Sequence, residues 1–162
     1  MESAYNGGVN RISVGIESSS DVMLNTLGRT HNRSDAENAV KRIKNAGFKN
    51  ISADLMIGLP KSSIKTVKED IDFLVSLNIP HISAYILKVE ENTKFSKSGI
   101  EISNEDEQAN QYLFMCSELE KHGFLHYEIS NFANKGFESR HNLKYWNCEE
   151  YLGLGPSAHS FI

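Results

Sequence analysis

Residues 138–146 read Glu-Ser-Arg-His-Asn-Leu-Lys-Tyr-Trp and bring the only tryptophan of the chain together with a histidine, an arginine and a tyrosine. An imidazole nitrogen can ligate iron, flat rings can stack on a planar ligand, and a guanidinium pairs with carboxylates. A haem offers all three partners, so His141 is a candidate iron ligand, with Arg140, Tyr145 and Trp146 as candidate contacts. The alternative is ordinary packing of aromatic side chains in a loop.

Composition narrows the classes of protein to which the chain can belong. Its 162 residues are 40% apolar with a mean hydropathy of -0.40, which is typical of one soluble globular domain. The formal net charge is -4 and the basic residues are scattered, which argues against nucleic-acid binding. No apolar run approaches the roughly 20 residues of a membrane span, and no signal sequence is visible. These features predict a cytoplasmic protein.

The elements that must position the motif follow an alternating strand and helix pattern, which predicts an α/β fold with a parallel sheet. Strands are expected at 11–17, 51–58, 82–87 and 127–132, and helices at 21–27, 35–46, 63–77 and 104–123. Ser34-Asp35-Ala36-Glu37 predicts a capping box at the start of the second of these helices.

The three parallel strands share an unusual division of their side chains. Alternation makes one face apolar and the other small, polar or charged, with Glu17 and Asp54 expected on the polar face at the carboxyl ends of adjacent strands. A filled eight-stranded barrel or a doubly wound sheet has no such polar face, so a wider, incomplete barrel with a ligand cavity fits better. The alternative is a half-covered sheet with a solvated face. Two bare sheet edges are also expected, which indicates a fragment of a larger barrel.

Taken together, the motifs resemble those of the radical S-adenosylmethionine family, in the branch around oxygen-independent coproporphyrinogen oxidase and its related haem chaperones. The resemblance covers nearly the whole chain and rests on six segments in order, at 8–18, 27–31, 54–60, 81–85, 127–133 and 140–146. The last segment contains His-Asn-x-x-Tyr-Trp, which separates the chaperones from the oxidase and adds Asn142 to the candidate haem contacts.

The resemblance implies part of an open six-unit (β/α) barrel, with about three βα units in residues 1–123 and the start of a chaperone-type C-terminal extension in 124–162. It also implies S-adenosylmethionine contacts at Glu17, Arg29, Asp54, Ile57 and Gly58. Among these, Arg29 suits the methionyl carboxylate, and the two acids suit hydroxyls or the ammonium group. The position of Glu17 is commonly Gln in relatives. Arg29 could instead complement the end of the preceding helix.

One part of the family pattern is missing from the chain. The Cys-x-x-x-Cys-x-x-Cys run that holds a [4Fe–4S] cluster is absent, and Cys116 and Cys148 cannot replace it. The resemblance implies the cluster and S-adenosylmethionine for a longer parent protein, with the cysteines and further βα units upstream. We therefore assign no catalytic residue and expect this chain alone to be inactive as a radical enzyme.

Three functions remain open from the sequence. The leading one is a haem-binding chaperone that delivers haem to acceptor proteins, with His159 as a second candidate iron ligand. The second is a fragment of a radical oxidase that decarboxylates porphyrinogen propionates. The third is an unrelated α/β domain with another small ligand. The oligomeric state cannot be predicted.

Overall fold

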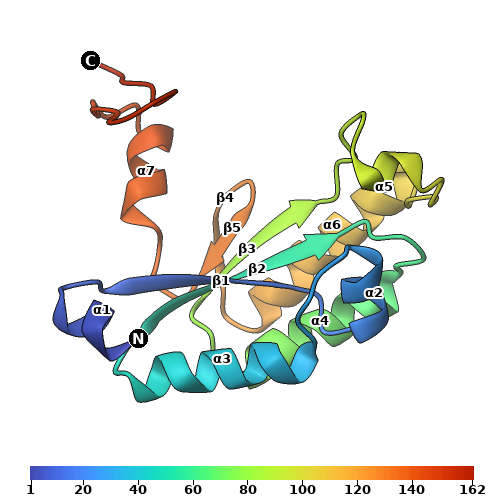
Figure 1. The fold of residues 1–162 in the computed structure, drawn as a ribbon, viewed down its shortest axis with the longest axis horizontal. Helices are drawn as coiled ribbons and strands as arrows, with labels where there is room; N and C mark the ends of the chain where they lie inside the picture. Colours follow the sequence, from blue (N-terminus) through green and yellow to red (C-terminus); the bar gives the residue numbers. More distant parts are fainter.

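A mixed five-stranded sheet forms the centre of the molecule (Figure 1). The computed structural model describes residues 1–162, except for the side chain of residue 94. In chain order the elements are α1 (Glu2–Asn6), β1 (Arg11–Glu17), α2 (Asp21–Thr26), α3 (Arg33–Asn45), β2 (Asn50–Ile57), α4 (Ile64–Ser76), β3 (His81–Ile86), α5 (Lys94–Lys97), α6 (Glu105–Lys121), β4 (Leu125–Glu128), β5 (Asn131–Ala133) and α7 (Arg140–Trp146). The strand order is β1-β2-β3-β5-β4, and β1, β2 and β3 are parallel. The predicted α/β class and the three βα units are confirmed.

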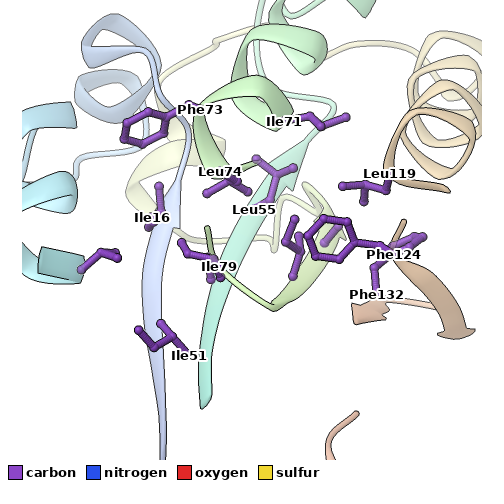
Figure 2. Close-up of a cluster of buried hydrophobic side chains, with 14 of the residues drawn as sticks. Ile16, Ile51, Leu55, Ile71, Phe73, Leu74, Ile79, Leu119, Phe124 and Phe132 are labelled. Carbon is purple, nitrogen blue, oxygen red and sulfur yellow. The ribbon is translucent and has the colours of Figure 1, made fainter. Parts of the chain in front are cut away.

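The apolar face of the sheet makes the core, as the alternation of side chains predicts. Ile16, Leu55 and Ile82 point toward the helices and are almost fully buried. Figure 2 shows Ile71 and Leu74 of α4 in this cluster, with Leu119 of α6 beside Phe124 and Phe132 (Figure 2). The opposite face of β1 carries Ser13 and Gly15, which are exposed. The helices therefore cover one face and leave part of the polar face open.

Local hydrogen bonds explain where two of the helices begin. The N-cap of α4 is Ser63, whose side chain accepts from the Thr66 backbone N–H, close to the predicted start. The capping box of α3 is formed by Asn32 and Asp35, so the predicted box at Ser34 was wrong by two residues. Asn is as good an N-cap as Ser, and the earlier residue gives the helix an extra half turn.

The chain segment after α6 differs most from expectation. The single strand predicted at 127–132 is wrong, because β4 and β5 form an antiparallel hairpin there. Strand β5 pairs antiparallel with β3, joining Ile82 to Phe132, so one of the two predicted bare edges is covered. The expected domain boundary at 123/124 falls just before this hairpin, which continues the same sheet; the division itself stays a prediction.

Helix α7 stands apart from the rest of the fold. In Figure 1 it projects from the sheet near the amino ends of the strands, whereas α2 and α5 lie at their carboxyl ends (Figure 1). None of its seven residues is buried. Among the residues that the structure describes, no helix has both the length and the apolar character needed to cross a membrane.

Candidate functional site

The carboxyl end of β1 holds an ion pair between two of the predicted cofactor residues. Glu17 takes a left-handed backbone conformation with φ of 66°, and its carboxylate accepts a hydrogen bond from Arg29. A Cβ on Gly15 would lie 3.3 Å from this carboxylate, so glycine lets the side chain fold back along the strand. Burial raises the pKa of Glu17, which Arg29 partly opposes. Glu17 and Arg29 are thus brought together, and each engages the other.

Asp54 is less terminal than the sequence suggested. It lies within β2, between Gly15 of β1 and Ser83 of β3, three residues before the strand ends, so its expected place at the carboxyl end was wrong. Its carboxylate accepts from the Ser13 hydroxyl at 3.2 Å. Burial raises its pKa, with Ser13 and the nearby guanidinium groups opposing the rise. Asp54 is therefore available on the polar face, close enough to Glu17 and Arg29 to influence both charges.

A buried aspartate that the sequence analysis missed holds the loop after β1. Asp70 of α4 accepts hydrogen bonds from the Ser19 backbone N–H at 2.5 Å, the Ser19 hydroxyl at 2.7 Å and the Ser18 hydroxyl at 3.0 Å. The residue is only 7% exposed, and burial raises its pKa. Because Ser18 follows Glu17 directly, this clamp fixes the turn that points Glu17 toward Arg29. In the sequence, an acid among the apolar residues on one face of α4 is the signal that could have identified Asp70.

The end of β2 is fixed in a similar way by α6. The Gly58 N–H donates to Gln111 Oε1 at 3.1 Å, and the Ile57 carbonyl accepts from the Leu87 N–H at 2.8 Å. Gly58 has φ of 72°, and a Cβ there would lie 2.9 Å from Gln108, so no other residue fits easily. The backbone groups predicted to flank an adenine are thus already paired. A nucleoside here would rely on packing and on other polar groups.

A cavity of about 310 Å³ opens beside Arg29 at the carboxyl ends of β2 and β3. Met56 and Leu87 supply apolar walls, and Glu90 lies at the same cavity. Ligand pockets combine apolar walls with a few polar groups, so this cavity with Arg29 suits part of a methionine-containing nucleoside. A [4Fe–4S] cluster does not fit the chain, because the sequence has only two cysteines.

Helix α7 places two of the candidate haem contacts on one face. His141 and Tyr145 are four residues apart, and the Tyr145 hydroxyl lies 2.9 Å from His141 Nε2, with the rings perpendicular at 4.9 Å. Asn142 and Trp146 occupy a different face, since consecutive helical residues turn by about 100°. Iron ligation through Nε2 would require the hydrogen bond to Tyr145 to break.

Aromatic packing continues from α7 into the C-terminal segment. Tyr145 packs edge to face on Tyr151 at 4.5 Å, and Tyr151 stacks on Phe161. Strand-like pairing between Tyr151 and Phe161 closes this segment into a loop. Trp146 is 53% exposed, so a large apolar ring faces solvent next to the His141 face. His159, the second candidate ligand, is exposed.

A series of hydrogen bonds joins the start of α7 to the sheet. The hydroxyl of Tyr127 in β4 accepts from the Ser139 N–H at 3.1 Å and lies 2.7 Å from His81 Nε2. His81 Nδ1 lies 2.8 Å from the Ser52 hydroxyl of β2. Ser139 is the N-cap of α7. The start of α7 is therefore joined through two side chains to the middle of the sheet.

One assignment of donors and acceptors pairs every group in this series of hydrogen bonds. If Tyr127 donates to His81 Nε2, then His81 Nδ1–H donates to the Ser52 hydroxyl. Ser52 in turn donates to the Ser83 hydroxyl, and Ser83 donates to Asn131 Oδ1 at 2.6 Å. His81 is neutral in this arrangement and only 1% exposed. Burial, with Arg11 nearby, lowers the pKa of His81 to about 3. His81 therefore has a structural role between β2 and β4.

The remaining groups that could bind metal have other partners. Asp72, Glu118 and His122 lie within 4.8 Å of one another on the outer helices. Lys68 pairs with Asp72 at 2.8 Å, and Lys121 pairs with Glu118 at 2.8 Å, so this is a surface network of ion pairs. Both cysteines are free thiols, and burial raises the pKa of Cys116, which fits its role as a small apolar residue.

The architecture and the comparisons agree on the class of protein. Residues 2–74 match the sequence profile of the Radical SAM superfamily. The fold is similar to the solved structure described as "Coproporphyrinogen III oxidase (HemN) from Escherichia coli is a Radical SAM enzyme", with a TM-score of 0.79 and 16% identity over 98% of this chain and 40% of that chain. The chain therefore has a partial radical SAM fold, as the resemblance implied.

The chain is also similar in sequence to haem chaperones. The chain is 39% identical to "Heme chaperone HemW" of Lactococcus lactis over 95% of its own length, and 41% identical to that of Bacillus subtilis over 96%. It spans 42% of the length of each of these relatives. The resemblance to the haem chaperone branch is thus confirmed over nearly the whole length of this chain.

Proposed function

We propose that this chain is part of a haem chaperone, and that the whole protein binds haem and passes it to acceptor proteins in the cytoplasm. The names of the relatives support this, since "Heme chaperone HemW" describes proteins similar to nearly all of this chain. The observation that carries the proposal is the exposed face of α7. There an imidazole and a phenol lie side by side with an indole on the next face, and all three can reach a planar ligand from solvent.

In this proposal the two ends of the sheet have different tasks. Glu17 and Arg29 at the carboxyl end, with Asp54 on the polar face of β2, would bind S-adenosylmethionine, and Arg29 would meet its carboxylate once Glu17 releases the guanidinium. S-adenosylmethionine supplies radical chemistry only with a cluster, whose ligands this chain lacks. The chain alone should therefore bind haem without turning over S-adenosylmethionine.

Titration with ferric haem tests the proposal. The unmutated chain should give a saturable shift of the visible haem spectrum, because an imidazole changes the iron ligand field. His141→Ala should abolish the shift or weaken binding at least about ten-fold, which corresponds to about 1.4 kcal/mol. His31→Ala and His122→Ala are the matched controls and should change little, and His159→Ala tests the second candidate ligand. Tyr145→Phe should retain binding, because it frees His141 Nε2.

Two results would contradict the proposal. One is the absence of saturable binding by the unmutated chain, and the other is an equal loss in all the histidine variants. The second candidate function, a fragment of a coproporphyrinogen oxidase, is favoured by the fold similarity. Tighter binding of coproporphyrinogen than of haem, unaffected by His141→Ala, would support that alternative.

A further inference from the structure

A polar cavity of about 430 Å³ lies between the start of α7 and the amino ends of β1 and β2. Its walls include Arg11, Asn50, Glu138, Arg140 and His141. Two arginines and the candidate iron ligand thus face one space, which is at the lower end of the usual range of ligand pockets. A cavity of this size takes the edge of a large planar molecule rather than the whole of it.

Arg11 is a charged residue of this cavity whose hydrogen-bond partners in the structure are both neutral. It is half-buried, and its Nη1 donates to Asn50 Oδ1 at 2.7 Å and to the Phe137 carbonyl at 3.1 Å. No Asp or Glu among the described side chains forms an ion pair with it, and Glu138 turns its carboxylate to the Gly136 N–H at 2.9 Å. Asp54 acts on Arg11 only at longer range, so the half-buried guanidinium has no anion in contact and has further N–H groups to offer.

We propose that this cavity binds a carboxylate, with Arg11 as the buried donor and Arg140 as the exposed one. The proposal rests on the proposed function, because His141 beside the cavity would then place the propionate edge of a haem in it. A carboxylate would give Arg11 a negative partner in direct contact and would accept charge-assisted hydrogen bonds. Asn50 fixes the guanidinium before the ligand arrives.

Esterified porphyrins separate this carboxylate site from binding through iron. Haem and its dimethyl ester share the iron and the ring but differ in the two negative charges. The unmutated chain should bind haem about ten-fold more tightly than the ester, the size of effect expected for a charge-assisted hydrogen bond. Protoporphyrin IX and its dimethyl ester, followed by quenching of Trp146 fluorescence, repeat the comparison without iron.

Two variants test Arg11 in complementary ways. Arg11→Gln removes the charge and should abolish the preference for the acid over the ester. Asn50→Asp keeps the contact with Arg11 and gives it an internal carboxylate, so the preference should fall with the fold intact. Arg42→Gln, an exposed arginine on α3, is the matched control and should leave the preference unchanged. Far-ultraviolet circular dichroism confirms that each variant is folded.

The outcomes distinguish this proposal from the proposed function. Equal binding of acid and ester by the unmutated chain overturns the carboxylate site, even if His141 proves to ligate iron. An acid preference that survives both Arg11→Gln and Asn50→Asp also overturns it. If haem fails to bind at all, the proposed function fails, and the metal-free pair still decides whether the cavity recognises carboxylates.

Discussion

The two ends of the sheet are built differently, although both carry residues that the sequence singles out. At the carboxyl end, Glu17 is held by the buried clamp of Asp70, and the clamp is part of the core. At the amino end, α7 has no buried residue and depends on Tyr127 for its attachment. The first site is preorganised by the fold, whereas the second is an exposed helix whose N-cap is hydrogen-bonded to the sheet through Tyr127. A bound cofactor benefits from the former, and a ligand that must be handed on benefits from the latter.

The largest expected effect is the loss of the Asp70 contacts at the carboxyl end of the sheet. Asp70→Ala removes the acceptor of three donor groups and leaves buried Ser18 and Ser19 without their partner, so the free energy of unfolding should fall by about 3 kcal/mol. Urea denaturation measures the change. Asp72→Ala, an exposed acid on the same helix, is the control and should cost about 0.5 kcal/mol or less. Equal losses would show that the clamp has no special role.

An effect of intermediate size tests His81, which lies in the sheet between the two ends. Unfolded His81 binds a proton below pH 6.5, whereas the folded residue stays neutral until about pH 3. Stability from this group is thus complete above pH 6.5 and is lost as the pH falls toward 3. From neutral pH to pH 5 the loss is about 2 kcal/mol.

Denaturation curves at several pH values check this expectation. His81→Gln should remove that part of the pH dependence, while His159→Gln, at an exposed position, should keep it. The difference between the two variants isolates His81 from the carboxyl groups, whose raised pKa values act in the opposite sense. Parallel curves for the two variants would contradict a buried neutral His81.

The smallest expected effect concerns the attachment of α7 at the amino end of the sheet. Tyr127→Phe deletes the hydroxyl that accepts from Ser139 and also pairs with His81 Nε2, which should cost about 1 kcal/mol and raise the rate of trypsin cleavage after Arg140 or Lys144 about five-fold. Tyr85→Phe, at an exposed hydroxyl on β3, is the control. Unchanged cleavage in Tyr127→Phe would mean that α7 is held by other contacts, and the contrast between the two ends would disappear.

Local patterns in the sequence predict much of this fold. The period-two alternation in 11–17 and the periodic apolar residues of 63–77 are decided by neighbours along the chain, and the structure has β1 and α4 there. The β4–β5 hairpin was read as one strand, because its turn at residues 129–130 carries no glycine or proline signal. Seven residues ending in two aromatics were read as a motif rather than as a helix, since α7 has no apolar stripe to reveal it.

The candidate sites were predictable only in part. The residue types at Glu17, Arg29 and His141 indicate their chemistry, and their spacing allows them to be named. The residues that position them cannot be found this way, because Asp70 is 51 residues from Ser19 and Tyr127 is 46 from His81. Such pairs depend on how helices and strands pack, which the local pattern does not specify.

The attachment of α7 through its N-cap residue has a consequence for how its backbone exchanges hydrogen with solvent. Amides in the core strands exchange only when the sheet unfolds, whereas an element without buried side chains opens on its own at a much lower free energy. The protection of the α7 amides should therefore follow the bond between Tyr127 and Ser139 rather than the stability of the domain. Deuterium uptake would mark α7 as a separate cooperative unit, loose enough to open many times before the sheet unfolds once.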